Sequence, residues 1–304
     1  MQMKQRQPES PAIRPPSEWR SVLVRLTRGC KWNRCRFCGI YPHMGVKEFS
    51  IRPLAEIKDD IDMLRELRPR AETAFFGDAD PLQIGIDNFT EAAHYLRHRI
   101  PVKRLTCYAR ASTLRRFTEE DMKRLKTAGL DRVHIGLESG DDEVLRFHRK
   151  GQSAKMVREA CAGLHKAGIE ISFYVLLGLG GFDNWRRHVT RTAELVNAIN
   201  PHFVRLRRLW LFGDEVNGCP LRQKIGDGSF VPQTPEGTVL ELKLFVELLD
   251  GVSSFVTCDH ANNYVRVAGR MMEDRPEMLA GIDDFLARPT GERQAHYRAV
   301  GSQI

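Results

Sequence analysis

The chain has 304 residues, of which 42% are hydrophobic and 28% charged, a composition ordinary for a soluble globular protein. No stretch of eighteen apolar residues occurs, which excludes a transmembrane helix. Residues 1–20 lack the apolar core of a signal peptide, so we expect a cytoplasmic protein. The formal net charge of +8 favours anionic partners, but the basic residues are spread along the chain and select no ligand class.

Residues 1–20 contain Pro8, Pro11, Pro15 and Pro16 and show no apolar periodicity, which predicts a flexible leader. After it, short apolar runs alternate with segments whose apolar residues recur every three or four positions, as strands alternating with helices do. The predicted strands are Val22–Leu26, Thr73–Phe76, Val102–Thr106, Arg132–Leu137, Glu170–Leu177 and Phe203–Leu211.

Helices are predicted between these strands, and residues at their ends favour helix starts and stops. Thr118 with Asp121 three residues later is a capping-box pattern. Ser153 is a good N-cap, and Gly168 suits the end of the same helix. The predicted helices are Leu54–Leu67, Thr118–Gly129, Ser153–Gly168 and Trp185–Ile199, followed by Thr234–Gly251 and, after a short strand near Ser254–Thr257, by Pro276–Leu286.

The six-fold alternation of strand and helix predicts the fold class. It indicates an α/β protein whose parallel strands form a partial (β/α)6 barrel resembling a TIM barrel. We expect a leader at 1–20, a barrel core at 21–212 and a small C-terminal extension at 213–304 packed on the barrel. Catalytic groups in such barrels lie where the strands end, at their C-terminal edge.

Three of the seven cysteines, Cys30, Cys35 and Cys38, fall within nine residues directly after the first strand. In a reducing cytosol this clustering indicates a metal site and not disulfides. Three thiolates can hold three irons of a [4Fe–4S] cluster and leave the fourth open to a chelating cosubstrate such as S-adenosylmethionine (SAM). The alternatives are a zinc site completed by His43, or buried cysteines without a ligand.

The loop 28–39 reads Arg-Gly-Cys-Lys-Trp-Asn-Arg-Cys-Arg-Phe-Cys-Gly and resembles the radical SAM superfamily. Four residues, instead of the usual three, separate the first two cysteines, and Phe37 supplies the aromatic before the last one. The spacing is similar to that of a branch described as like oxygen-independent coproporphyrinogen III oxidase or elongator-type radical SAM proteins. The resemblance covers residues from about 11 to about 288. It implies a [4Fe–4S] cluster, SAM, and an external electron donor such as flavodoxin or ferredoxin.

The resemblance also implies cosubstrate-binding residues at later strand ends. Gly77 and Asp78 match, by position, the turn that contacts the methionine amino group. Glu138, followed by Ser139, matches the position that binds the ribose hydroxyls, and Lys150 is expected to reach the cosubstrate carboxylate. The local alternatives are a plain turn at Asp78 and an exposed loop lysine at 150.

Two further strand ends carry candidate ligands. Gly178 lies in a glycine-rich stretch where related enzymes bind adenine through the backbone. Tyr108 and Arg110 are placed to meet the carboxylate of the cosubstrate or the substrate, and a structural role is an equal alternative for each.

Substrate contacts are predicted at the end of the barrel sequence. Arg205 and Arg207 share one face of a strand and would bind an anionic substrate if that face points inward, or be solvated if it points outward. Cys258 and Tyr264 lie in a polar segment and are candidates to donate a hydrogen atom to a product radical, or parts of a hydrogen-bonded loop. Cys219 is far from Cys258 in sequence, so we predict one cluster.

Three functions remain open from the sequence. The first is a radical enzyme in which reductive cleavage of SAM gives a 5′-deoxyadenosyl radical that abstracts hydrogen from a small molecule. The second is a radical SAM enzyme that modifies RNA, which the net charge favours. The third is a non-catalytic carrier of haem or metal related to the coproporphyrinogen oxidase-like branch.

Overall fold

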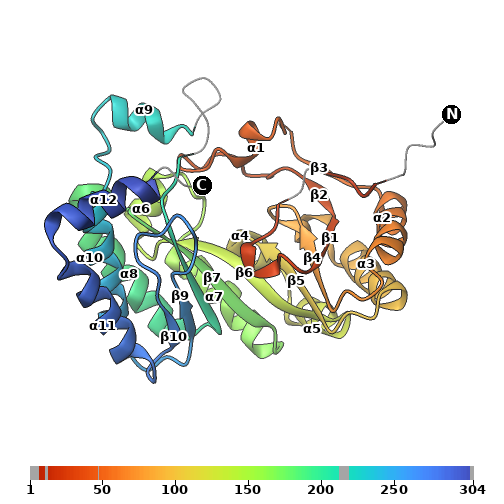
Figure 1. Cartoon of the computed structure of the whole chain (residues 1–304). Coiled ribbons are helices and arrows are strands. Elements are labelled where there is room, and N and C mark those ends of the chain that lie inside the picture. Colours follow the sequence, from red (N-terminus) through yellow and green to blue (C-terminus); the bar gives the residue numbers. More distant parts are fainter. Residues whose placement is uncertain (1–6, 11–12, 47, 212–218, 302–304) are drawn as a thin grey trace. The chain divides into compact units, whose positions relative to one another are not determined.

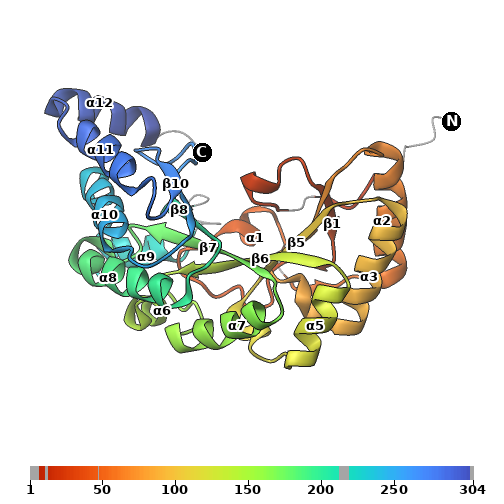
Figure 2. The same cartoon turned by 90° about the horizontal axis from the view of Figure 1, so that it is seen from below.

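The computed structural model describes residues 7–10, 13–46, 48–211 and 219–301 (Figures 1 and 2). It divides into two compact units. The first comprises residues 1–33, 40–135 and 159–171, and the second 34–39, 136–158 and 172–304. No helix in the described ranges is both long enough and apolar enough to cross a membrane.

The first unit contains the strands β1 (Val22–Arg25), β4 (Thr73–Gly77), β5 (Arg104–Ala109) and most of β6 (Leu130–Glu138), each parallel to the next. β2 (Thr27–Arg28) and β3 (Ser50–Ile51) form a separate antiparallel pair. The helices are α1 (Ile40–His43), α2 (Leu54–Leu67), α3 (Ile86–Arg99), α4 (Ala111–Leu114), α5 (Glu119–Thr127) and most of α7 (Ala154–Lys166), with 3-10 turns at Pro16–Glu18 and Pro81–Ile84. Helices α2, α3 and α5 lie side by side (Figure 2).

The second unit contains the end of β6, most of β7 (Glu170–Leu177) and the strands β8 (Phe203–Arg208), β9 (Phe255–Thr257) and β10 (Ala268–Arg270). β7, β8 and β9 are parallel neighbours, and β10 is antiparallel to β9. Its helices are α6 (Asp142–Phe147), α8 (Gly181–Ile199), α9 (Leu221–Gly226), α10 (Pro235–Leu248), α11 (Arg275–Leu286) and α12 (Thr290–Gly301).

The predicted fold class is confirmed: the strands β1, β4, β5, β6, β7, β8, β9 and β10 form one mostly parallel sheet in an α/β fold, consistent with the partial (β/α)6 barrel. The capping box of Thr118 and Asp121 is also confirmed. The third predicted strand lies further along the chain than expected, at 104–109, because its buried residues continue past Thr106 to Cys107 and Ala109. The last barrel strand ends earlier than predicted, at Arg208, whose N–H donates to the side-chain oxygen of Asn263 at 2.8 Å.

The described part of the leader is less independent of the core than the sequence predicts. Glu18, at the end of a 3-10 turn, is only 1% exposed. Its carboxylate accepts a hydrogen bond from the Ser21 hydroxyl at 2.7 Å and lies 3.2 Å from Nε2 of His134 in β6. A buried carboxylate is tolerated only when it is paired in this way, so these contacts attach residues 13–20 to the first unit. The proposed boundary at 212–213 lies outside the described residues.

Glu18 makes the stability of the first unit depend on pH. Burial by itself raises the pKa of Glu18, but the interactions with His134, Ser21 and Arg104 outweigh it and lower this pKa from 4.5 to about 2. A carboxylate with a lowered folded-state pKa stabilises the fold fully above its unfolded pKa, and this contribution is lost as pH falls from about 4.5 through about 2. We expect Glu18→Gln to cost on the order of 3 kcal/mol at pH 6 and much less at pH 2.5.

The measurement is the free energy of unfolding by urea at both pH values, for the wild type and for Glu18→Gln. Glu72→Gln is the matched control, because Glu72 pairs with Lys103 on the surface. If the free energies of unfolding of the wild type and Glu18→Gln differ by the same amount at pH 6 and pH 2.5, the lowered pKa assigned to Glu18 is contradicted.

Candidate functional site

The base of the cysteine loop is held by a buried ion pair in the first unit. Asp78, at the end of β4, is fully buried and accepts hydrogen bonds from Nε of Arg25 at 2.8 Å and from the Gly29 N–H at 3.1 Å. Burial raises the pKa of Asp78, while Arg25 and the Gly29 N–H oppose the shift. Asp78 therefore joins the end of β4 to the residue before Cys30, and Gly77 contributes its carbonyl to the Leu26 N–H at 2.7 Å.

Cys35 and Cys38 belong to the second unit, where Phe37 fixes the segment between them. Phe37 is 8% exposed and packs in an apolar cluster with Val144 and Phe230, against which both thiols lie. The neighbouring Arg36 donates to the carbonyl of Phe147 at 2.6 Å. The aromatic residue before the last cysteine therefore positions the loop by packing.

The donor set of the loop fits an iron–sulfur cluster in its chemistry. Cys30, Cys35 and Cys38 are all partly exposed, and none of them forms a disulfide. Cys30 lies in the first unit, and Cys35 and Cys38 lie in the second. Within the described residues, no three His, Cys, Asp or Glu side chains are gathered as metal ligands. The assignment of these cysteines to the cluster stays a prediction from their spacing.

Two further predicted residues, Tyr108 and Arg110, lie at the end of β5 in the first unit. The Tyr108 ring packs edge-on against Phe75, with ring centroids 4.9 Å apart. The Arg110 guanidinium lies 4.9 Å from the ring centre of Trp32, inside the cysteine loop. Arg110 therefore contacts the loop itself.

Glu138 and Lys150, expected to bind different parts of the cosubstrate, form one buried ion pair in the second unit. Nζ of Lys150 donates to Oε1 of Glu138 at 2.7 Å, and the side chains are 11% and 12% exposed. Gly136 provides the space for this pair, because a Cβ there would lie 2.3 Å from the same oxygen. Glu138 itself has φ of +63°, a strained conformation for a residue with a side chain, and such strain clusters at functional sites.

Ser139 is directed away from this pair. Its hydroxyl is fully buried and lies 2.7 Å from Nδ1 of His188 in α8, and it accepts the Asp141 N–H at 3.0 Å. Burial lowers the pKa of His188 to about 4, so its imidazole is neutral near pH 7. These contacts connect the end of β6 to α8.

Gly178, at the end of β7, has a partner that the sequence did not reveal. Its backbone has φ of +85°, and its N–H donates to Oε2 of Glu241 in α10 at 2.8 Å. Glu241 is fully buried, and burial raises its pKa well above the usual range, while the Gly178 N–H opposes the shift. The one sequence signal was a carboxylate on the apolar face of the predicted helix at 234–251.

The arginine face of β8 is not solvated. Arg205 is 8% exposed and the Arg207 side chain 13% exposed, so the solvated alternative is excluded. Tyr174 of β7 is paired in register with Arg205, and its ring lies 5.6 Å from the Arg207 guanidinium. Asp259 approaches Nη1 of Arg207 at 3.6 Å. The Arg205 guanidinium lies 5.4 Å from the ring centre of Phe203, so the second unit contains two nearly buried arginines, each beside an aromatic ring.

The two candidate hydrogen-atom donors, Cys258 and Tyr264, follow β9 and are held differently from each other. Cys258 is buried, and burial raises the pKa of its thiol to about 12, so it stays protonated. The Tyr264 hydroxyl accepts a hydrogen bond from Nη1 of Arg208 at 3.0 Å, and burial raises its pKa. Both side chains line the same small pocket and keep their hydrogen near neutral pH.

Residues 24–193 match the family model of the radical SAM superfamily. None of the curated proteins compared matches the sequence. The chain is similar in fold to HydG, a maturase of the [FeFe]-hydrogenase, with 16% identity, coverage of 86% of this chain and 54% of that chain, and a TM-score of 0.52.

Two other solved structures are similar. The archaeal Elp3 of Methanocaldococcus infernus has 14% identity, coverage of 88% of this chain and 64% of that chain, and a TM-score of 0.50. The radical SAM methyltransferase TsrM from Kitasatospora setae has 18% identity, coverage of 63% and 38%, and a TM-score of 0.49. The chain spans 38%, 36% and 52% of the length of the first three structures it matches, and at these identities the likeness shows the fold alone.

Proposed function

Because the chain belongs to the radical SAM superfamily, we propose that it is an enzyme that starts radical chemistry on an anionic small molecule. As a radical SAM enzyme it uses a [4Fe–4S] cluster and SAM. A [4Fe–4S] cluster held by Cys30, Cys35 and Cys38 would supply an electron to SAM, and SAM would supply the radical that takes a hydrogen atom from the substrate. The protein positions these groups and excludes water.

We assign the cluster to Cys30, Cys35 and Cys38. Their thiols are partly exposed and free of disulfides, and three cysteines leave one iron open to a chelating cosubstrate. Asp78 and Phe37 hold the two ends of the loop through the contacts described above. An external donor such as flavodoxin or ferredoxin is part of this proposal, as is a cytoplasmic location, where thiols stay reduced.

The cosubstrate site is assigned to the ends of the middle strands. The pair of Glu138 and Lys150 offers acceptor oxygens to ribose hydroxyls and a donor to a carboxylate. The positive φ of Gly178 leaves its backbone open to close approach, as contact with a flat adenine requires. Tyr108 and Arg110, at the end of β5, are assigned to the carboxylate side of the cosubstrate.

The observation that supports an anionic substrate is the buried arginine face of β8. Burying a guanidinium group is costly unless it meets negative charge, and Asp259 lies 3.6 Å from Nη1 of Arg207. A carboxylate or phosphate is the kind of substrate group that such guanidiniums bind bidentately. Cys258 and Tyr264 are assigned as candidate hydrogen donors to the product radical.

The test is anaerobic reconstitution with iron and sulfide, followed by dithionite and SAM, with 5′-deoxyadenosine measured by chromatography. We expect its formation, and faster formation with anionic than with neutral small molecules. If the cluster forms but no 5′-deoxyadenosine is produced, the result would favour a non-catalytic carrier. Stimulation by RNA alone would favour the RNA-modifying alternative. Colourless protein with stoichiometric zinc would overturn the cluster assignment.

A further inference from the structure

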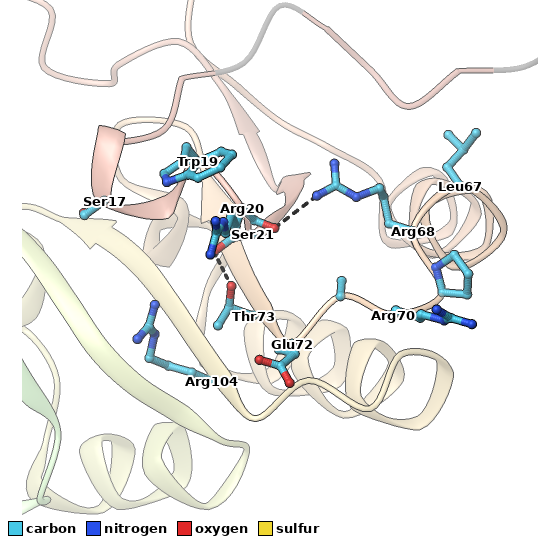
Figure 3. A pocket seen from close by; sticks show the side chains of 12 residues that line it. Ser17, Trp19, Arg20, Ser21, Leu67, Arg68, Arg70, Glu72, Thr73 and Arg104 are labelled. Carbon is cyan, nitrogen blue, oxygen red and sulfur yellow. Dashed lines mark hydrogen bonds between the residues drawn. The ribbon is translucent and has the colours of Figure 1, made fainter.

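A second site lies in the first unit, at the opposite ends of the strands from the cysteine loop. A pocket of about 660 Å³ is lined by residues that precede β1, by the connection from α2 to β4, and by the first residues of β4 and β5 (Figure 3). Gly77 is the last residue of β4, and Cys30 lies beyond the last residue of β1, so strands of four to six residues, roughly 15 Å long, separate the pocket from them.

The pocket is strongly basic. Four of its twelve described lining residues are arginines, namely Arg20, Arg68, Arg70 and Arg104, and Glu72 is the only acidic one among them. Glu72 is already bound by Lys103 at 2.8 Å. Arg70 is exposed and makes no ion pair with any described residue. Arg104 pairs with Glu18 at 3.5 Å, so the excess of positive charge at the pocket comes from Arg20, Arg68 and Arg70, which make no ion pair within the described residues.

Two buried polar atoms at this pocket lack partners. Neither Oγ of Ser17 nor Nε of Arg104 makes a hydrogen bond within the described residues. A buried donor without a partner costs about 1–3 kcal/mol. An anion with several acceptor oxygens would bind both donors and so offset this cost.

Trp19 adds an aromatic surface to the same pocket. Its side chain is exposed at 61%, although it is the largest apolar group of the lining, and the Arg20 guanidinium lies 4.5 Å from its ring centre. Figure 3 shows Trp19 next to Arg20, with Arg104 on one side of the pocket and Arg68 and Arg70 on the other. An indole beside several guanidiniums suits a ligand with a flat ring and phosphate groups.

From this arrangement we propose that the pocket binds a phosphorylated ligand of mononucleotide size, at a site distinct from the SAM site. The volume lies within the usual range for small-molecule pockets, about 300–1,000 Å³. More than one guanidinium is available, which favours a phosphate or pyrophosphate over a single carboxylate. The site requires neither cluster nor SAM, so its test is independent of the proposed function.

The test is calorimetric titration of the full chain without its cluster, using AMP, ATP, adenosine and pyrophosphate in turn, with excess SAM present to occupy the cosubstrate site. We expect AMP or ATP to bind, and adenosine to bind at least tenfold more weakly. The variant Arg20→Gln/Arg70→Gln should weaken nucleotide binding at least tenfold. Neither side chain has an ion pair in the described structure, so the variant is expected to fold.

The matched control is Arg186→Gln/Arg298→Gln, which removes the same charge from exposed positions. Arg186 lies 4.4 Å from the ring centre of Trp185, the same arrangement as Arg20 on Trp19. This control should bind nucleotide as the wild type does. Trp19→Ala should weaken binding of AMP but leave pyrophosphate unchanged.

Several outcomes would overturn the proposal. The first is that the wild type binds no nucleotide at millimolar concentration. The second is that nucleotide affinity falls equally in the pocket variant and in the control variant. The third is that SAM displaces the bound nucleotide. Binding of an oligoribonucleotide at least tenfold more tightly than ATP would assign the pocket to RNA instead. SAM cleavage should be unchanged in the pocket variant after reconstitution, which separates this site from the proposed catalytic function.

Discussion

Replacing Cys35 by serine is expected to abolish cluster binding and to lower formation of 5′-deoxyadenosine by more than about 100-fold. A serine hydroxyl stays protonated near neutral pH and is a far poorer ligand for iron than a thiolate, and a three-cysteine site has no spare ligand. The measurements are iron and sulfide content after anaerobic reconstitution, the visible absorption of the cluster, and 5′-deoxyadenosine by chromatography.

The matched control for this substitution is Cys161→Ala. Cys161 is buried on α7, and burial raises the pKa of its thiol, so it is not available as a ligand. This variant should keep its iron and its activity. Full iron content in Cys35→Ser, with SAM cleavage retained, would show that the cluster lies elsewhere and would overturn the assignment of the loop.

Replacing Arg25 by methionine should destabilise the first unit by about 3–5 kcal/mol, because it leaves the carboxylate of Asp78 buried without its charge partner. Nη2 of Arg25 lies 2.7 Å from Asp78, and both side chains are nearly inaccessible. Arg25 also pairs with Glu9 at 3.0 Å, so part of the lost stability comes from breaking this contact with the leader. The free energy of unfolding by urea is the measurement.

Two comparisons make this prediction specific. The double variant Arg25→Met/Asp78→Asn should be more stable than Arg25→Met alone, because it no longer buries an unpaired carboxylate. Arg124→Met, which breaks the exposed pair of Arg124 with Asp87, should cost less than about 1 kcal/mol. A loss in Arg25→Met no larger than the loss in Arg124→Met would contradict a structural role for the pair.

Local sequence patterns predicted the fold class and most elements, because helix caps and apolar periodicity act over a few residues. The capping box of Thr118 and the helix after Leu54 are examples. Short elements with little apolar pattern were missed, among them α1, α6 and the β2–β3 pair. The period of two placed Arg205 and Arg207 on one face, but only their burial in the structure decides that this face is not solvated.

The candidate site was predicted less completely because its contacts join distant parts of the chain. Glu241 meets Gly178 across 63 positions, and Ser139 meets His188 across 49. Neither pairing leaves a local pattern in the sequence. Burial of Glu18 beside His134, 116 positions away, was missed for the same reason. The sequence of residues 1–20 therefore predicted a flexible leader that makes no contact with the core.

The strained backbone of Glu138 creates a conflict between the thermal stability of this protein and its candidate site. A side chain at φ of +63° costs about 1 kcal/mol or more, which a glycine would recover. Selection of variants for heat resistance would therefore favour Glu138→Gly, and that change would remove the carboxylate that holds Lys150. Directed evolution for thermal tolerance should consequently screen catalytic turnover in the same round, or it will select against the site.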